Sequence, residues 1–232
     1  MAKMTITKKD FILLAVAVAG LSTLAANKAQ AADTSLANRV TAIRQQAPNL
    51  SEQAVETSLK AYDYAHSHNI TNKSTFAIID YKLASNKKRL FVIDAKNNKI
   101  IDQEYVAHGR GSGGLYATKF SDTPETHESS LGVYLTGSTY KGDHEGMSLR
   151  LNGLDKGFND AVFKRAIVMH SAWYANKQFV EKSGYAGRSW GCPAVGQDVA
   201  SKVVKELKNG CIIVGYYPSK AWLSHSKFLQ AA

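Results

Sequence analysis

The sequence predicts a mainly β (α+β) protein, in which short strands follow residue 75 and a few helices precede and interrupt them. Two observations support this class. Apolar residues recur at helical spacing before residue 72 and then occur in short runs of β-formers. Asn, Asp, Gly and Lys gather between these runs, which is typical of turns between strands. The chain has 232 residues and no internal repeat or low-complexity linker, so one domain preceded by helices is the simplest organisation.

The first 31 residues have the pattern of a secretory signal peptide. Lys3, Lys8 and Lys9 give a basic start, residues 11–24 are apolar or small and uncharged, and residues 29–31 (Ala-Gln-Ala) offer small side chains to a signal peptidase. The apolar run is short for a membrane span, which needs about 20 residues. We therefore expect an exported protein of the periplasm or cell envelope, which touches the membrane only if this segment stays uncleaved.

The charge of the chain narrows the range of partners. Removing residues 1–31 takes away four lysines and one aspartate, and the formal charge falls from +10 to +7. A positive charge of this size fits ordinary solubility, and it also fits attraction to anionic wall polymer or lipid headgroups. No basic motif interleaved with aromatics is present, and an exported chain rarely meets nucleic acid. We expect no nucleic-acid partner.

Residues 32–72 are expected to form an N-terminal helical arm. Apolar residues recur at helical spacing from Leu36 until Pro48. Ser51 is a suitable N-cap for a second helix, and the His-Ser-His-Asn stretch at 66–69 is expected to end it.

Residues 73–232 are expected to form one β-rich domain. A hairpin turn is expected near Asn97-Asn98, and a helix ending in Leu207 is expected to stop at Asn209-Gly210. The expected strands are 76–79, 90–93, 100–106, 131–135, 148–151, 166–169 and 212–217.

The chain contains two cysteines, Cys192 and Cys211. In an exported protein such a pair is first a possible disulfide. Their surroundings differ, however. Cys211 opens an apolar run and has the character of a small hydrophobe in a strand, whereas Cys192 lies among Gly, Ser, Trp and Arg in the stretch 187–193. A disulfide and a reactive thiol at Cys192 are therefore competing interpretations.

A cysteine nucleophile needs a base, because a free thiol with a pKa near 8.5 is mostly protonated at neutral pH. His170 ends the apolar run 166–169, so its ring is expected at the end of a strand. Gly191 lets a substrate approach the backbone closely, where N–H groups stabilise an oxyanion. The competing interpretation of His170 is a structural core histidine.

Several motifs resemble one known family. Ser189-x-Gly191-Cys192 preceded by His170 resembles the signature of the L,D-transpeptidase catalytic domain. The longer string Gly-Arg-Ser-Trp-Gly-Cys-Pro-Ala at 187–194 is more similar to a divergent branch, described as murein L,D-transpeptidase catalytic domain-like. Further stretches that fit this branch in the same order are 108–112, 129–134, 151–159 and 166–171, so the resemblance runs from about residue 75 to residue 217.

The resemblance implies an L,D-transpeptidase-like β-sandwich catalytic domain over residues 73–232, with the cysteine at the rim of a groove. It implies that the cysteine attacks the carbonyl of the third residue of a peptidoglycan tetrapeptide stem, expels D-alanine and forms a thioester. Carried over, Cys192 is the nucleophile and His170 the general base. The Ser171 carbonyl orients the histidine, and the N–H groups of Gly191 and Cys192 serve the oxyanion.

The sequence departs from the common family pattern at two positions. Trp190 stands where the family usually has histidine, and Ala194 where it usually has Arg or Asn. Arg188 is able to replace the missing cation as a partner for a stem carboxylate, although a solvated arginine is the competing interpretation. The residues assigned to substrate binding are Arg188, Ser189, Trp190, His108 and Tyr134, and the competing interpretation of His108 is a structural histidine at a strand end.

No cofactor is expected. The glycine-rich stretch 109–114 lacks the Gly-Lys-Ser/Thr of a phosphate loop, and no His-Glu-x-x-His spacing of a zinc peptidase occurs. Peptidoglycan stem peptides are the expected partner. Three alternatives remain open: an L,D-carboxypeptidase that uses water as acceptor, a non-catalytic wall-binding module, and a secreted cysteine peptidase, although no papain-like motif is present.

Overall fold

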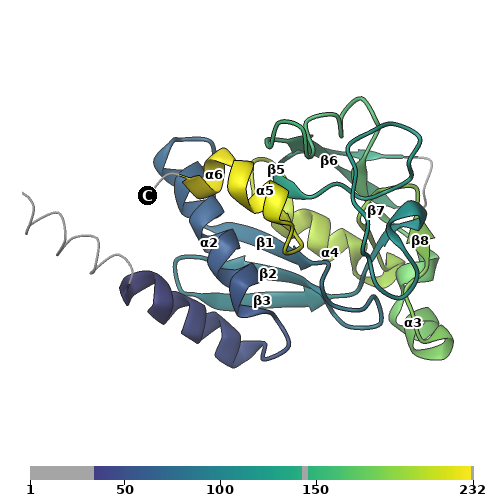
Figure 1. The fold of residues 1–232 in the computed structure, drawn as a ribbon. Helices are drawn as coiled ribbons and strands as arrows, with labels where there is room; N and C mark the ends of the chain where they lie inside the picture. Colours follow the sequence, from purple (N-terminus) through teal and green to yellow (C-terminus); the bar gives the residue numbers. More distant parts are fainter. Residues whose placement is uncertain (1–33, 143–145, 231–232) are drawn as a thin grey trace, which may run out of the picture. The chain divides into compact units, whose positions relative to one another are not determined.

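The computed structural model describes residues 34–142 and 146–230. The chain divides into two compact units, Met1–Arg39 and Val40–Ala232. The described residues of the first unit are helical. The second unit holds all the described strands (Figure 1). The predicted signal peptide lies outside the described residues.

The strands of the second unit join in one mixed sheet of order β3-β2-β1-β10-β5-β6-β7-β9-β4-β8. The strands are β1 (Thr75–Asp80), β2 (Leu90–Asp94), β3 (Lys99–Glu104), β4 (Val106–Gly109), β5 (Gly132–Lys141), β6 (Met147–Gly153), β7 (Val168–Ser171), β8 (Arg188–Ser189), β9 (Ala194–Val195) and β10 (Ile212–Tyr216). Residues 34–46 are helical. The helices that follow are α2 (Glu52–Ser67), α3 (Lys177–Ser183), α4 (Gln197–Leu207), α5 (Lys220–His225) and α6 (Lys227–Gln230), with short 3₁₀ turns η1 (Arg110–Ser112) and η2 (Trp173–Ala175).

The predicted class, a sheet-rich fold with some helices, is confirmed. The narrower expectation of a β-sandwich is not confirmed, because the described strands are hydrogen-bonded into a single sheet and a sandwich requires two. Neighbouring strands are antiparallel except for three parallel pairs: β1 with β10, β4 with β8, and β7 with β9.

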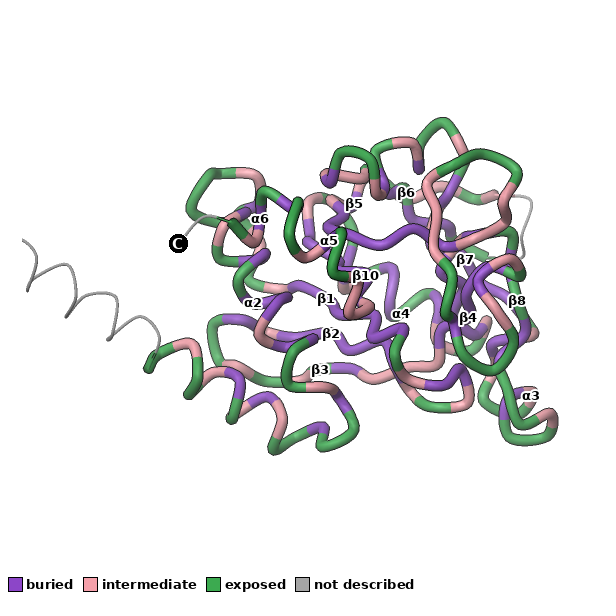
Figure 2. The backbone as a smooth tube through the Cα atoms, viewed as in Figure 1, coloured by how far each residue is buried: buried purple, intermediate pink, exposed green. Residues whose placement is uncertain are grey.

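The core lies around β1 and β10. Helix α2 packs on both strands, and α4 packs on β1, β2, β6 and β7. Figure 1 shows α2, α5 and α6 in front of these strands and α4 behind them. A strand that is covered on both faces needs apolar residues at successive positions. Every residue of β10 is accordingly buried, and Figure 2 shows the buried backbone running through β1 and β10.

Local signals in the sequence are confirmed where they depend on backbone chemistry. The Ser51 side chain caps α2 by accepting a hydrogen bond from the Ala54 N–H. Asn98 has a left-handed φ of 50° in the β2–β3 turn, and left-handed Asn209 and Gly210 follow α4. Helix α2 belongs to the same compact unit as the sheet, and the boundary expected at residue 72 stays a prediction.

Three short strands were not predicted from the sequence, and one strand was misplaced. The strand expected at 100–106 ends at Glu104, and β4 follows it as a separate strand. β8 and β9 have only two residues each, too few to show any periodicity. β7 begins at Val168 rather than at Ala166, because Ala166 has a left-handed φ of 54° that no strand accommodates. Among the described residues no helix is both long and apolar enough to cross a membrane.

Candidate active site

Cys192 lies on a turn whose two ends are fixed in the sheet. Before it, β8 pairs in parallel with β4, and after it β9 pairs with both β4 and β7. The register sets His170 opposite Ala194, two residues after Cys192. The His170 N–H also donates to the Pro193 carbonyl at 3.4 Å. The sheet therefore places the predicted base on β7, next to β9, the strand that follows the predicted nucleophile.

The turn is held by a hydroxyl at its centre. Ser189 Oγ donates to the Cys192 carbonyl at 2.6 Å and accepts from the Gly191 N–H at 3.1 Å. The Ser189 side chain is thus buried inside the turn, which argues against its predicted contact with substrate. The Gly191 N–H, predicted to serve the oxyanion, is occupied by Ser189 in this geometry, and that role stays a prediction.

Gly191 is required for packing. Its φ is +122°, which side chains rarely adopt, and a Cβ there would lie 2.9 Å from both the Glu128 carbonyl oxygen and Ile167 Cδ1. The reason predicted from the sequence was close approach of a substrate. The structure gives this glycine another reason, which is close approach of the backbone at residue 128.

His170 is buried and oriented by its own strand. Its Nδ1 lies 2.8 Å from the Ser171 carbonyl oxygen, as the resemblance implied. A carbonyl only accepts hydrogen bonds, so Nδ1 carries the proton of the neutral ring and Nε2 is the basic nitrogen. The orientation therefore suits a general base.

The Cys192 sulfur is half-buried against the start of β7. The Val168 N–H points at Sγ over 3.5 Å, and Sγ lies 3.9 Å from the Ala166 carbonyl oxygen. Burial raises the pKa of the Cys192 thiol, while the Val168 N–H and the positive charge of Arg165 oppose this rise. The resting sulfur is consequently a protonated thiol at neutral pH. Both cysteines are free, so the competing disulfide interpretation is wrong.

Arg165 is a residue of this site that was not predicted from the sequence. Its side chain is only 4% exposed and lies 3.6 Å from the carboxylate of Asp122. Its Nη1 donates to the Ser121 carbonyl and to Ser130 Oγ, and its Nη2 donates to the Glu128 carbonyl. In the sequence Arg165 is one of many cations, and only its position directly before the run 166–169 was a signal.

One serine joins three segments around the turn. Ser129 Oγ accepts from the Gly109 N–H and donates to the Gly191 carbonyl, both at 3.0 Å. A Cβ on Gly109 would overlap the His127 carbonyl oxygen and lie 2.8 Å from Gly191 Cα. The stretches 109–112 and 127–129 are therefore in backbone contact with the cysteine turn.

Trp190, Arg110 and His127, here called the Trp190 cluster, lie on the surface of these segments. The Trp190 side chain is 69% exposed, and its ring lies 4.9 Å from that of His127. The Arg110 guanidinium carbon lies 5.2 Å from the Trp190 ring centre. Arg110 Nη2 is 3.0 Å and Nε 3.2 Å from His127 Nδ1. Arg110 and His127 were not foreseen as site residues.

Arg188 is exposed at the start of β8, the strand that leads into the cysteine turn. Its Nη1 lies 3.4 Å from the Gly113 carbonyl oxygen. It also lines a pocket of about 280 Å³ together with Gly114, Leu115, Gly184 and Tyr185. The predicted substrate contact of Arg188 is thus compatible with its exposure.

Burial argues against the predicted substrate contacts of His108 and Tyr134. His108 is fully buried and accepts at Nδ1 from the buried Arg89, 2.7 Å away. Burial, aided by the charge of Arg89, lowers the pKa of His108 to about 4. The Tyr134 hydroxyl is also buried and donates to the Ser130 carbonyl. Both side chains are enclosed by the protein, so neither is exposed to a ligand in this structure.

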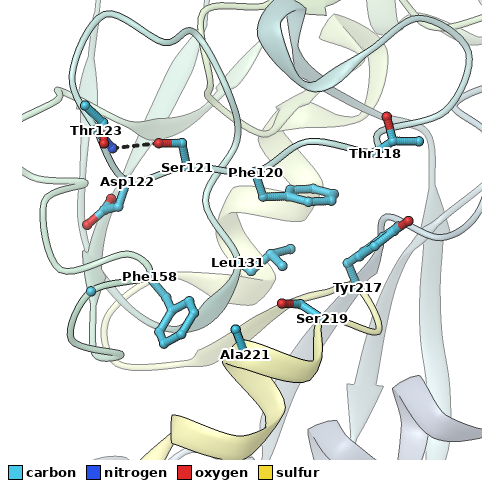
Figure 3. Close-up of a pocket in the computed structure, with 11 residues that line it drawn as sticks. Thr118, Phe120, Ser121, Asp122, Thr123, Leu131, Phe158, Tyr217, Ser219 and Ala221 are labelled. Carbon is cyan, nitrogen blue, oxygen red and sulfur yellow. Dashed lines mark hydrogen bonds between the residues drawn. The ribbon is translucent and has the colours of Figure 1, made fainter.

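A second pocket, of about 500 Å³, lies beyond the Arg165–Asp122 pair. Figure 3 shows Phe120 and Tyr217 on one side of it and Phe158 on the other, with Asp122 at its edge. The described ranges contain no group of three or more His, Cys, Asp or Glu side chains placed to hold a metal.

His170 is held by a carbonyl on β7, next to the strand that follows the half-buried Cys192, and this order fits the general pattern of a cysteine with an oriented base. The model of the L,D-transpeptidase catalytic domain family matches residues 46–216, and the chain belongs to this family. The resemblance stated from the motifs is therefore confirmed. Enzymes of this family act on the peptide stems of peptidoglycan.

Two solved structures are similar to the chain. An L,D-transpeptidase from Mycobacterium smegmatis is 14% identical, with a TM-score of 0.38 over 62% of this chain and 59% of that chain. A structure of an LD transpeptidase in complex with imipenem is 12% identical, with a TM-score of 0.35 over the same shares. The chain spans about three fifths of the length of each. No curated protein matches it.

Proposed function

We propose that the protein is an exported L,D-transpeptidase that acts on peptidoglycan stem peptides through a thioester on Cys192. The observation that carries the proposal is the pair of contacts at His170: Nδ1 bonded to the Ser171 carbonyl at 2.8 Å, and a strand register that aligns His170 with Ala194, next to the cysteine turn. Membership of the family gives the substrate class. The signal-peptide pattern of residues 1–31 supports export.

In the first half-reaction His170 Nε2 takes the thiol proton as Sγ attacks the carbonyl of the third stem residue. A bond forms between Sγ and that carbon, and the bond from the carbon to the D-alanine nitrogen breaks. The departing amine receives the proton back from His170. The products are free D-alanine and a thioester.

In the second half-reaction an amine of a neighbouring stem attacks the thioester carbonyl. Its proton passes to His170 and then to the departing sulfur, which restores the thiol and leaves a new amide cross-link. If water attacks instead, the product is a shortened stem and the enzyme is a carboxypeptidase.

The raised pKa of Cys192 favours proton transfer during attack over a preformed ion pair. Stabilising the oxyanion is assigned first to the Cys192 N–H, because the Gly191 N–H is bonded to Ser189 Oγ until that contact opens. Arg188 and Trp190 are both exposed beside the turn and are proposed to contact the stem.

Mass spectrometry of the full chain incubated with a disaccharide-tetrapeptide tests this proposal. We expect a mass increase on Cys192, release of D-alanine and formation of dimers. The Cys192→Ala variant should give none of these, whereas Cys211→Ala, the matched control at the buried cysteine, should behave like the unmodified chain. D-alanine release without dimers would identify the carboxypeptidase. The same blank trace from the unmodified chain and Cys192→Ala would leave the wall-binding module as the better account.

A further inference from the structure

The Trp190 cluster contains an arginine that has no acidic partner within the described part of the chain. Within residues 34–142 and 146–230, no carboxylate lies within ion-pairing distance of Arg110. Its contacts are the indole ring of Trp190 and His127 Nδ1. By contrast, buried Arg165 is paired with Asp122. Among the residues that the structure describes, no carboxylate therefore neutralises the charge of Arg110 beside the cysteine turn.

The hydrogen-bonding pattern of Arg110 leaves one edge of its guanidinium for a ligand. Nε and Nη2 bond to His127, so the N–H groups of Nη1 and the second N–H of Nη2 have no partner among the described residues. Two parallel N–H groups of this kind match the two oxygens of a carboxylate. The same contact keeps Nδ1 of His127 as an acceptor, so the ring proton lies on Nε2 and supplies a further donor.

The backbone holds this cluster in place. His127 has a left-handed φ of 53° and Glu125 one of 64°, which side chains rarely adopt without support. The His127 carbonyl accepts from the Gly111 N–H at 3.0 Å, and Thr126 Oγ1 donates to the Thr123 carbonyl at 2.9 Å. A strained segment that is fixed in this way beside a reactive site is typical of a preorganised binding surface.

We propose that Arg110, with His127 and Trp190, binds a carboxylate of the stem peptide and selects stems in which that group is free over stems in which it is an amide. Arg110 pairs with both oxygens, while the exposed indole covers the aliphatic part of the same residue. The inference rests on the proposed function for its substrate class. It adds Arg110 as a determinant of specificity, packed against Trp190, which stands where the common family pattern has a histidine.

The test compares two disaccharide-tetrapeptides that differ at one position only. In one of them a side-chain carboxyl group of the peptide stem is a free acid, and in the other the same group is an amide. For the unmodified chain we expect kcat/KM for D-alanine release to favour the free acid by about tenfold or more, as for a hydrogen bond to a charged group. Arg110→Gln should reduce this preference to less than about threefold by slowing the free acid, with little effect on the amide. Arg110→Lys should restore part of it, since it keeps the charge and loses the fork.

Lys99→Gln is the matched control, because Lys99 is an exposed cation at the start of β3, away from the cysteine turn in the sheet order. It should leave the preference unchanged. If Arg110→Gln lowered kcat/KM equally for both ligands, Arg110 would only support its loop. If the preference for the free acid stayed unchanged, Arg110 would take no part in recognition. Either result overturns the inference.

Binding to the Cys192→Ala background separates this inference from the proposed function. Calorimetry with the same two ligands should give a preference for the free acid that Arg110→Gln removes, even if no variant releases D-alanine. In that case the proposed reaction would be contradicted and the proposed binding site would be supported. If the Cys192→Ala chain bound the free acid no better than the amide, the binding site would be wrong whatever the activity.

Discussion

The two cysteines of this chain are both half-buried or buried, yet their surroundings differ in kind. Cys211 directly precedes β10, where its sulfur meets the Glu206 carbonyl oxygen at 3.7 Å and burial raises its pKa to about 11. Cys192 also has a raised pKa. The charge of Lys73 opposes the rise at Cys211, whereas at Cys192 both the Val168 N–H and the charge of Arg165 oppose it. Burial alone makes a thiol inert. The difference is that a backbone N–H also points at the sulfur of Cys192, a contact of the kind that favours a thiolate.

The largest effect is expected when the base proposed for Cys192 is removed, because no such base is proposed for Cys211. His170→Ala should lower kcat for D-alanine release by about 10²–10⁴-fold, because we propose that His170 takes the thiol proton. The melting temperature serves as a check that the fold is retained. A loss below about threefold in a folded variant would contradict the assignment of His170 as general base.

Arg165→Met tests the surroundings of Cys192, where the charge of Arg165 opposes the rise in the pKa of the thiol. It leaves the buried carboxylate of Asp122 without its cation, and we expect a loss of about 3–5 kcal/mol in the free energy of unfolding, measured in urea. Removing the positive charge also raises the pKa of Cys192 further, so alkylation of Cys192 near pH 8 should slow. Arg165→Lys, which keeps the charge, should slow it less. Equal alkylation rates in all three chains would exclude Arg165 as an electrostatic support.

The pH dependence of stability tests Cys211. Its thiol titrates near the ordinary value of 9.0 in the unfolded chain and at about 11 in the fold. The unfolded state therefore loses this proton first, and stability should fall between pH 9 and pH 11 by up to about 2–3 kcal/mol. Urea unfolding at pH 8 and pH 11 should show a smaller fall in Cys211→Ala than in the unmodified chain. Equal falls in both chains would contradict the raised pKa.

The smallest effect is expected from Cys211→Ala at neutral pH. Loss of one buried sulfur should cost about 1 kcal/mol of unfolding free energy and leave turnover within twofold. Thermal melts and the D-alanine assay measure the two quantities. A tenfold loss of turnover would place Cys211 in the functional site, against its burial at the start of β10.

What the sequence predicted well is what local chemistry determines. Ser51 caps its helix and Asn98 occupies its turn because caps and left-handed residues act within a few positions. Cys192 and His170 were found because glycine-rich and apolar neighbours set them apart. The Ser171 contact was implied by the family resemblance.

What the sequence missed depends on contacts between distant segments. Arg165 lies in the site because it contacts Asp122 and the backbone at residue 128, and nothing in its sequence neighbours encodes that burial. His108 was assigned to substrate from its motif, but Arg89 and the surrounding sheet enclose it. Arg110 and His127 meet only because the segments that carry them pack against Gly191.

The hydroxyl of Ser129 ties together parts of the molecule that would otherwise vary separately. It bonds at once to Gly109, beside the loop with Arg110, and to Gly191, beside Cys192. A shift of the loop that carries Arg110 therefore also strains the hydrogen bond to the turn that carries Cys192. We therefore expect a relative with a different stem preference to differ in the side chains at positions 110 and 190 and to keep the same backbone. Moving the loop that carries residue 110 would also displace the sulfur of the cysteine at position 192.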